Sequence, residues 1–580
     1  MAPGPGSRML RILGDVTRMN ARAPVAAGPA WHLFVPKLFI VLRRGYGAAE
    51  LRKDVVAGLT VAIVALPLAM ALAIASGTTP DKGLVTAIVA GALISALGGS
   101  RFNIGGPTGA FVVVVFGVIA KHGYDGLVVA TAMAGVLLMI AGFARLGTWI
   151  KYIPLPVVTG FTSGIAVIIA SSQVADLLGL SIDKVPAEFI AKWSTYAAHL
   201  ESVNFAAVAV ATGALATIVG LRIAAPKWPG FLLAVGGASL AVWMLDLPVA
   251  TIGSRFGELP ATLPTPRLPH FDWTQARELV PSAFTIAFLA GVESLLCAVV
   301  ADGMTGRRHK SNCELVAQGV ANVGSALFGG LPATGAIART ATSIRAGAVS
   351  PLAGILHAAF LLLFMMLLAP LTRYIPLASL AAVLMVVAWN MSEVEQFTHL
   401  MGAPAGDRLV LLTTFFLTVL VDLTVAIEVG VVLAAVLFMH RMAEAVQQQT
   451  QQRLLVEDED DFEPAAGGAY DRRRNLPPGV ETFELRGPFF FGVANLLGDV
   501  LDRIGQPPKL FVLVLREVPI IDATGIDALR SFADRCRRDG TRLVLVGLQP
   551  SAREALERMG VIPRDDVSLA TTFEEALARE

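Results

Sequence analysis

The stretch GGLPATGAIART, residues 329–340, interrupts a run of apolar segments with a Gly/Pro break and then starts a new helix. Shortly before it, the apolar span 280–300 carries one charged residue, Glu293. A charged side chain at the bilayer centre is unfavourable by at least ~2.5 kcal/mol, so such residues usually serve a function. This combination predicts a buried ion site. The alternative is that Glu293 lies near a helix end and is merely solvated.

The composition of the chain is that of a polytopic α-helical membrane protein. Of its 580 residues, 55% are hydrophobic and 16% are charged, and the mean hydropathy is +0.66. Soluble proteins carry about 25% charged residues. The formal net charge of +1 gives no indication of nucleic-acid binding. The three cysteines have no metal or disulfide spacing, and no nucleophile–base set is visible, so we expect no metal, no cofactor and no enzymatic activity.

Residues 1–50 hold seven basic residues from Arg8 to Arg44 and no apolar run long enough to span a membrane. By the positive-inside rule this is a cytoplasmic leader. The transporter region predicted over 51–445 then contains two series of seven apolar segments. They lie near 54–76, 84–98, 107–120, 126–146, 154–178, 205–222 and 229–246, and near 281–301, 312–328, 334–346, 351–369, 376–390, 408–422 and 424–440.

The two series show a weak internal repeat. The motif GGPTGA at 105–110 resembles LPATGA at 331–336, and YIPL at 152–155 recurs at 374–377. The two offsets, 225 residues from Pro107 to Pro332 and 222 from Tyr152 to Tyr374, are nearly equal. Because each copy has seven spans, an odd number, the second copy must enter the membrane from the opposite side. The sequence therefore predicts an inverted repeat, as in many secondary transporters.

The short segments 107–120 and 334–346 indicate where a substrate would bind. Paired, Gly/Pro-interrupted segments at corresponding positions of two repeats point to a transporter binding site. Helices that start at Thr108 and near Thr334 would present free N–H groups and about +0.5 charge each. Since the repeats are inverted, the two helix starts approach each other near the midplane. An anion is the expected occupant.

After residue 445 the composition changes to that of a soluble region. Residues 446–478 include a Gln run, an acidic run and Arg472–Arg474, which predict a polar linker. Residues 479–580 predict one small α/β domain. Its expected strands lie over 481–485, 510–515 and 542–546, and its helices near 493–504, 525–538, 551–559 and 572–579.

Several motifs resemble the sulfate permease (SulP) family of anion transporters: GVESLL at 291–296, DGMTG at 302–306, NCELVAQG at 312–319 and AIAR at 336–339. Together with WNMSE at 389–393, they resemble most a bacterial C4-dicarboxylate transporter of that family. The tail resembles the family's STAS domain. The resemblance implies fourteen segments, a core domain (segments 1–4 and 8–11), a gate domain (5–7 and 12–14), elevator-like transport and a homodimer.

The resemblance also implies site residues. The anion-contacting positions fall at the starts of the two short segments, on Thr108, Gly109, Ala336, Ile337, Ala338 and Arg339. Leu68 and Leu72 match pocket-lining positions, although the first of these is polar in some members of the family and apolar here.

Coupling is predicted to depend on Glu293. Sodium-coupled members of the family have Asp at its position and Thr four residues later, whereas this chain has Glu293 and Cys297. Because a thiol is a poor ligand for sodium, the difference favours protons as the coupling ion. We expect ionised Glu293 to cancel the charge of Arg339, and its protonation to release that charge for the substrate.

In the tail, the motif IDATG at 521–525 resembles the site of bacterial anti-sigma-factor antagonists that carries a phosphorylated Ser. Thr524 could take that role, with Asp522 beside it, and a cytosolic partner would follow. The alternative is that Asp522 or Thr524 simply caps the next helix.

The sequence thus predicts an inner-membrane secondary transporter for a small anion, with both termini cytoplasmic. The first candidate activity is proton-coupled uptake of a C4-dicarboxylate. The alternatives are sulfate or bicarbonate transport by the same site, and an anion sensor that signals through the STAS domain.

Overall fold

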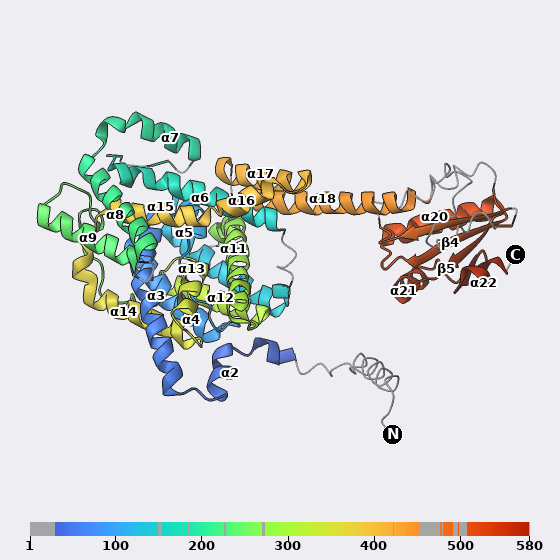
Figure 1. Cartoon of the computed structure of the whole chain (residues 1–580), viewed down its shortest axis with the longest axis horizontal. Coiled ribbons are helices and arrows are strands. Elements are labelled where there is room, and N and C mark those ends of the chain that lie inside the picture. Colours follow the sequence, from blue (N-terminus) through green and yellow to red (C-terminus); the bar gives the residue numbers. More distant parts are fainter. Residues whose placement is uncertain are drawn as a thin grey trace, which may run out of the picture. The chain divides into compact units, whose positions relative to one another are not determined.

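The computed structural model describes residues 30–148, 154–182, 185–186, 188–225, 228–269, 273–421, 423–451, 476–477, 479–490, 497 and 507–578. The chain divides into two compact units, Met1–Val431 and Val432–Glu580 (Figure 1). The first unit holds the site, and the second holds the tail domain.

The described helices form the predicted two series of seven segments. The first series is α3 (Ala48–Ala75), α4 (Pro80–Leu97), the two halves of α5 (Gly109–Phe143), α6 (Leu155–Leu178), α8 (Phe205–Ala224) and α9 (Gly230–Leu245). The second is α11 (Trp273–Thr305), α12 (Ser311–Leu327), α13 (Ile337–Arg345), α14 (Leu352–Thr372), α15 (Leu377–Met391), α17 (Ala405–Leu420) and α18 (Leu423–Gln451).

Helix α5 is one continuous assignment but two segments, because Gly123 interrupts it with a non-helical backbone at φ 71°. Within the described residues, nine helices are long and apolar enough to cross a membrane, and α9, α12, α13 and α17 are shorter than these. The remaining helices of the first unit are short: η1 (Ala30–Phe34), α2 (Lys37–Arg43), η2 (Leu146–Thr148), α7 (Phe189–Ala198), η4 (Leu200–Ser202), α10 (Ile252–Phe256) and α16 (Val394–Met401).

Equivalent helices of the two series make equivalent contacts, each with helices of the other series. Helix α5 packs on α11 and α12, and the equivalent helix α14 packs on α3 and α4. Both contacts use small residues that let helix backbones approach closely. A side chain at Gly135 of α5 would lie 2.7 Å from the carbonyl oxygen of Gly319, and one at Gly58 of α3 would lie 2.7 Å from that of Ala353. This exchange is what two inverted repeats require.

The two chain breaks meet inside the first unit. The two-residue strands β1 (Gly105–Gly106) and β2 (Thr334–Gly335) pair antiparallel, with Gly105 opposite Gly335. The breaks are thereby joined directly, and each is followed by a helix start, that of α5 or that of α13.

Polar side chains satisfy the backbone at the second break. The amide of Asn322 brackets Ala333, donating from Nδ2 to its carbonyl oxygen at 2.9 Å and accepting from its N–H at 2.9 Å. Ser325 donates to Leu331 O, and the Leu331 N–H donates to Thr86 Oγ1. Irregular backbone at membrane depth is tolerated only when its polar groups are satisfied in this way.

The tail unit is a parallel sheet with helices on both faces. Its strands β3 (Val480–Arg486), β4 (Leu510–Glu517), β5 (Arg542–Val546) and β6 (Val567–Ala570) lie in that order. Its helices are α20 (Ala523–Arg538), α21 (Pro550–Arg558) and α22 (Phe573–Leu577). The three predicted strands and the helices over 525–538, 551–559 and 572–579 are confirmed, whereas β6 was missed. Except for Leu497, the expected helix over 493–504 lies outside the described residues.

The structure bears on two predicted boundaries, the start of the linker and the end of the leader. Helix α18 continues to Gln451, and Val446 is buried in the tail's core, so the predicted linker over 446–478 is wrong at its start. The leader is described from Ala30, where Lys310 Nζ donates to His32 O at 2.6 Å. Residues 1–29 and 452–475 lie outside the described residues.

Candidate anion site

Two helix starts form the centre of the candidate site. Helix α5 follows Thr108 as its N-cap, and α13 follows Ala336. For both helices, which lie in the described part of the chain, the N-cap side chain accepts no capping hydrogen bond. First-turn N–H groups that no side chain caps are candidates for binding an anion, although in α5 the Phe111 N–H already donates to Thr108 O at 3.3 Å. Ala336 is half-buried, and Ile337 and Ala338 are exposed, so the start of α13 is open.

Arg339 lies in the first turn of α13 and points towards the other break. Its side chain is buried, with the residue only 2% exposed, and Nη2 donates to Pro107 O at 3.1 Å. Neither Nε nor Nη1 has a hydrogen-bond partner among the described residues. A Cβ at Gly106 would lie 2.1 Å from Nη1, so the absence of a side chain there makes room for the guanidinium. The site thus holds a buried cation with unused donors.

Glu293 contacts the start of α5 rather than Arg339. Its Oε2 accepts a hydrogen bond from Thr108 Oγ1 at 3.0 Å. No ion pair joins Glu293 and Arg339 in the described structure, so any cancelling of their charges does not come from direct contact, and its effect on anion binding stays a prediction. The reason is geometric: the arginine reaches across to the loop before α5, while the glutamate reaches to the N-cap of α5.

The other predicted residues form the surroundings of these two charges. Leu68 and Leu72 are buried in the apolar core of the first unit, and their role as pocket-lining residues stays a prediction. Gly109 lies where core and gate helices meet, because a Cβ there would lie 2.6 Å from Met391 Sδ at the end of α15. Cys297 donates from Sγ to Thr340 Oγ1 at 3.2 Å. The thiol is therefore engaged with α13.

The family model described as "Sulfate permease family" matches residues 51–414, and the model described as "STAS domain" matches residues 474–576. The chain belongs to the sulfate permease family. Among its relatives is "Putative sulfate transporter YvdB" of Bacillus subtilis, which is 40% identical over 522 residues, 89% of this chain and 95% of YvdB. The "Bicarbonate transporter BicA" of Picosynechococcus sp. is 31% identical over 529 residues, 89% of this chain and 92% of BicA.

Solved structures show the same fold. The transmembrane domain of a cyanobacterial bicarbonate transporter BicA matches with a TM-score of 0.61 at 30% identity, over 66% of this chain and 98% of that domain. The murine Slc26a9 anion transporter in its inward-facing state matches with a TM-score of 0.82, over 98% of this chain and 97% of that one. At 18% identity, this second match shows the fold alone.

Sequence reasoning missed a second buried carboxylate of this sulfate permease domain. Glu314 of α12 is 0% exposed. Its Oε1 accepts from Asn103 Nδ2 at 2.6 Å, from Ser294 Oγ at 3.1 Å and from Gln318 Nε2 at 3.2 Å. Its Oε2 accepts from the Ser100 N–H at 3.0 Å. Glu314 thereby ties the loop before α5 to α11 and α12.

A signal for this network exists in the sequence. Glu314, Gln318 and Asn322 follow each other at intervals of four within an apolar segment, which places them on one face of a helix. All three are 0% exposed. A polar stripe in a predicted span could have indicated an internal network, but the partners on the loop over 98–108 depend on the tertiary structure.

In the STAS domain, Asp522 caps α20 by accepting the Gly525 N–H at 2.7 Å. This confirms the capping alternative for Asp522. Thr524 is exposed in the first turn of the same helix. Its phosphorylation, and a cytosolic partner that would read it, stay predictions.

Proposed function

We propose that this protein is a proton-coupled transporter of a small dianion, with C4-dicarboxylates such as succinate and fumarate as the first candidate substrates. The observation that carries the proposal is Arg339, a buried guanidinium beside two helix starts whose Nε and Nη1 have no partner among the described residues. Leaving a charge buried without a counter-charge costs several kcal/mol. A bound anion would supply that counter-charge.

The anion would be held by three groups together. Arg339 offers a charge-assisted hydrogen bond, and the starts of α5 and α13 offer N–H groups and partial positive charge. The exposed residues Ile337 and Ala338 mark the side from which an anion would enter. In this proposal the core helices carry the anion past the gate helices in an elevator-like movement.

The proton is assigned to Glu293. Its carboxylate hydrogen-bonds to Thr108, at a helix start that is proposed to bind the anion. An ionised carboxylate there would repel a dianion, whereas a protonated one would not, so proton and anion would bind together. Sodium is disfavoured, because the fourth residue after Glu293 is Cys297, whose Sγ is engaged with Thr340.

Sulfate is the second candidate substrate, and bicarbonate the third. The name of YvdB refers to sulfate and that of BicA to bicarbonate, and both relatives match over most of their length. A site made of one arginine and two helix starts suits any small oxyanion.

The proposal also includes topology and assembly. Fourteen segments, an even number, leave both termini on one side of the membrane, and the basic leader favours the cytoplasm. We place the protein in the bacterial inner membrane as a homodimer, in line with the family resemblance.

The test is uptake by the full chain in proteoliposomes driven only by a pH gradient, acid outside. We expect radiolabelled succinate to accumulate, fumarate to compete more strongly than sulfate or bicarbonate, and accumulation to increase as external pH falls. The reverse order of competition would assign the site to sulfate or bicarbonate instead.

The Glu293→Gln variant separates binding from coupling. It should retain anion binding and exchange while losing accumulation driven by pH. Glu278→Gln, at an exposed position of the same helix, is the matched control and should behave as the wild type. If Glu293→Gln still concentrates succinate against its gradient, the coupling assignment must be abandoned.

A further inference from the structure

A second cation of the first unit is buried without a counter-charge, far along the chain from Arg339. Lys192 of α7 is only 5% exposed. Within the described ranges its ammonium has no hydrogen bond or ion pair, and Nζ lies 6.0 Å from the centroid of the Phe116 ring. Burial lowers the pKa of this ammonium. Lysine is almost never this buried unless it is paired.

Tyr196 supplies an unused donor on the same side of the same helix. It lies four residues after Lys192, so the two side chains share one face of α7. The residue is 2% exposed, and its hydroxyl has no hydrogen-bond partner in the part of the chain that the structure describes. Burial and the charge of Asp176 raise the pKa of Tyr196 to about 12, so it stays a neutral donor. The carboxylate of Asp176 is paired with Arg255 at 3.0 Å.

The two donors lie where a core helix meets gate-side elements. Phe116 belongs to the first half of α5, the helix that starts at Thr108, and α7 packs on α6 and α17. Helices α3 and α6 are the first and fifth spans, so both end on the face opposite the leader. The region between Phe116 and α7, here called the seam, therefore lies on the membrane face opposite the leader. The proposed topology makes this the outer face.

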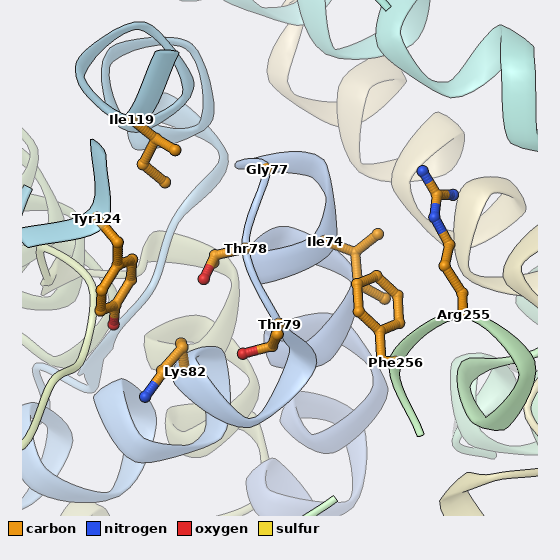
Figure 2. Close-up of a pocket in the computed structure, with 9 residues that line it drawn as sticks. All are labelled: Ile74, Gly77, Thr78, Thr79, Lys82, Ile119, Tyr124, Arg255 and Phe256. Carbon is orange, nitrogen blue, oxygen red and sulfur yellow. The ribbon is translucent and has the colours of Figure 1, made fainter. Parts of the chain in front are cut away.

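A cavity of about 440 Å³ opens beside this seam (Figure 2). Lys82, Thr78 and Thr79 line one part of it, with Arg255 and Phe256 across from them. Gly77 also lines the cavity, and a Cβ there would lie 3.0 Å from Cδ2 of Phe116, the ring next to Lys192. Phe116 thus lies close to Gly77 of the cavity lining, and the Lys192 ammonium lies over its ring.

We propose that Lys192 and Tyr196 form an outer anion-binding site, which holds a small anion before it reaches Arg339. The buried Lys192 side chain is unpaired and the buried Tyr196 hydroxyl has no partner among the described residues, so a small oxyanion would give both an acceptor. The aromatic ring of Phe116 stabilises the ammonium only partly while the site is empty. Movement of the core past α7 would open the seam and admit the anion. This inference rests on anion transport alone and does not need proton coupling.

The test is the initial rate of uptake by the full chain in proteoliposomes, measured separately with radiolabelled sulfate and succinate outside. Lys192→Gln should raise the KM for the external anion about tenfold with little change in kcat, since charge at an entrance mainly affects capture. Tyr196→Phe should raise KM by a smaller factor, and Lys192→Arg should restore most of the affinity. Lys121→Gln, which removes an exposed lysine at the end of the same half of α5, should leave KM unchanged.

The melting temperature distinguishes this role from a structural one. Lys192→Met removes a charge buried without a partner, so it should keep or raise the melting temperature while KM still rises. A lowered melting temperature together with a raised KM would show a structural lysine and overturn the proposal. So would an unchanged KM in Lys192→Gln.

The same uptake assay with added external chloride shows which anions occupy the outer site. Where chloride raises the KM of the wild type but not that of Lys192→Gln, the site accepts any small anion. Where chloride has no effect on either protein while the lysine substitution still raises KM, the site is selective for the transported anion. Loss of pH-driven accumulation in Glu293→Gln is measured separately, so failure of the coupling proposal and failure of the outer site remain distinguishable.

Discussion

The first half of α5 and helix α13 occupy equivalent places in the two repeats, yet they differ in what they contribute. The start of α5 is packed, because Gly109 lies against Met391 and Ile169. The start of α13 is open, with Ile337 exposed by 41%. Only α13 carries a cation in its first turn, Arg339. The duplication thus produced two similar helix starts with different surroundings and different side chains.

The difference shows how two inverted repeats with similar folds can form one site whose two sides carry different side chains. Arg339 of α13 reaches back to Pro107 O at the other break, and Thr108 of α5 reaches to Glu293. The proposed anion charge and the proposed coupling proton are therefore assigned to different helix starts. Substitutions on each side should consequently have effects of different kind and size.

The largest effect is expected for Arg339→Ala. Hydrogen bonds to charged groups contribute about 1.5–3 kcal/mol, so anion affinity should fall roughly 10- to 100-fold. Calorimetry of succinate and sulfate binding to the purified protein measures this. Arg345→Ala, at the exposed end of the same helix, is the matched control and should bind normally. Unchanged affinity in Arg339→Ala would show that Arg339 does not bind the anion.

A smaller loss is expected for Gly106→Ala, which keeps the charge but displaces it. The added Cβ would lie 2.1 Å from Arg339 Nη1, so the guanidinium must move away from Pro107. We expect anion affinity to fall by roughly tenfold, or about 1.4 kcal/mol. Gly117→Ala, where a Cβ meets nothing within 4 Å, is the control. Equal affinities in both variants would mean that the position of Arg339 is not critical.

The smallest effect is expected for Thr108→Val, which removes one hydrogen bond to Glu293. A net contribution of about 1 kcal/mol corresponds to roughly a fivefold change. The change should appear as a shift in the pH dependence of uptake more than as a loss of anion binding. Thr108→Ser retains the hydroxyl and should keep the wild-type profile. If uptake by Thr108→Val has the same pH dependence as uptake by the wild type, Thr108 takes no part in coupling.

Much of the architecture could be predicted without coordinates. Apolar runs report directly on spans, because a segment must be apolar to lie in a bilayer. The near-equal offsets of two motifs were enough to predict the inverted repeat and the pairing of the two short segments. Short apolar, β-branched runs likewise indicated the first three strands of the tail, whereas β6 has only four residues and was missed.

Local patterns alone could not predict how the charges are partnered. The sequence did not indicate that Glu293 contacts Thr108, or that Glu314 is the acceptor of a buried hydrogen-bond network. Partners such as Asn103 and Thr108 lie about 185 to 211 residues away in the chain, so only tertiary packing brings them within hydrogen-bonding distance. The same applies to Lys192, which looks like an ordinary surface lysine until the fold buries it. Sequence therefore predicts which residues enter the membrane region, and the tertiary structure decides which of their charges are satisfied, because distance between side chains is a property of the fold.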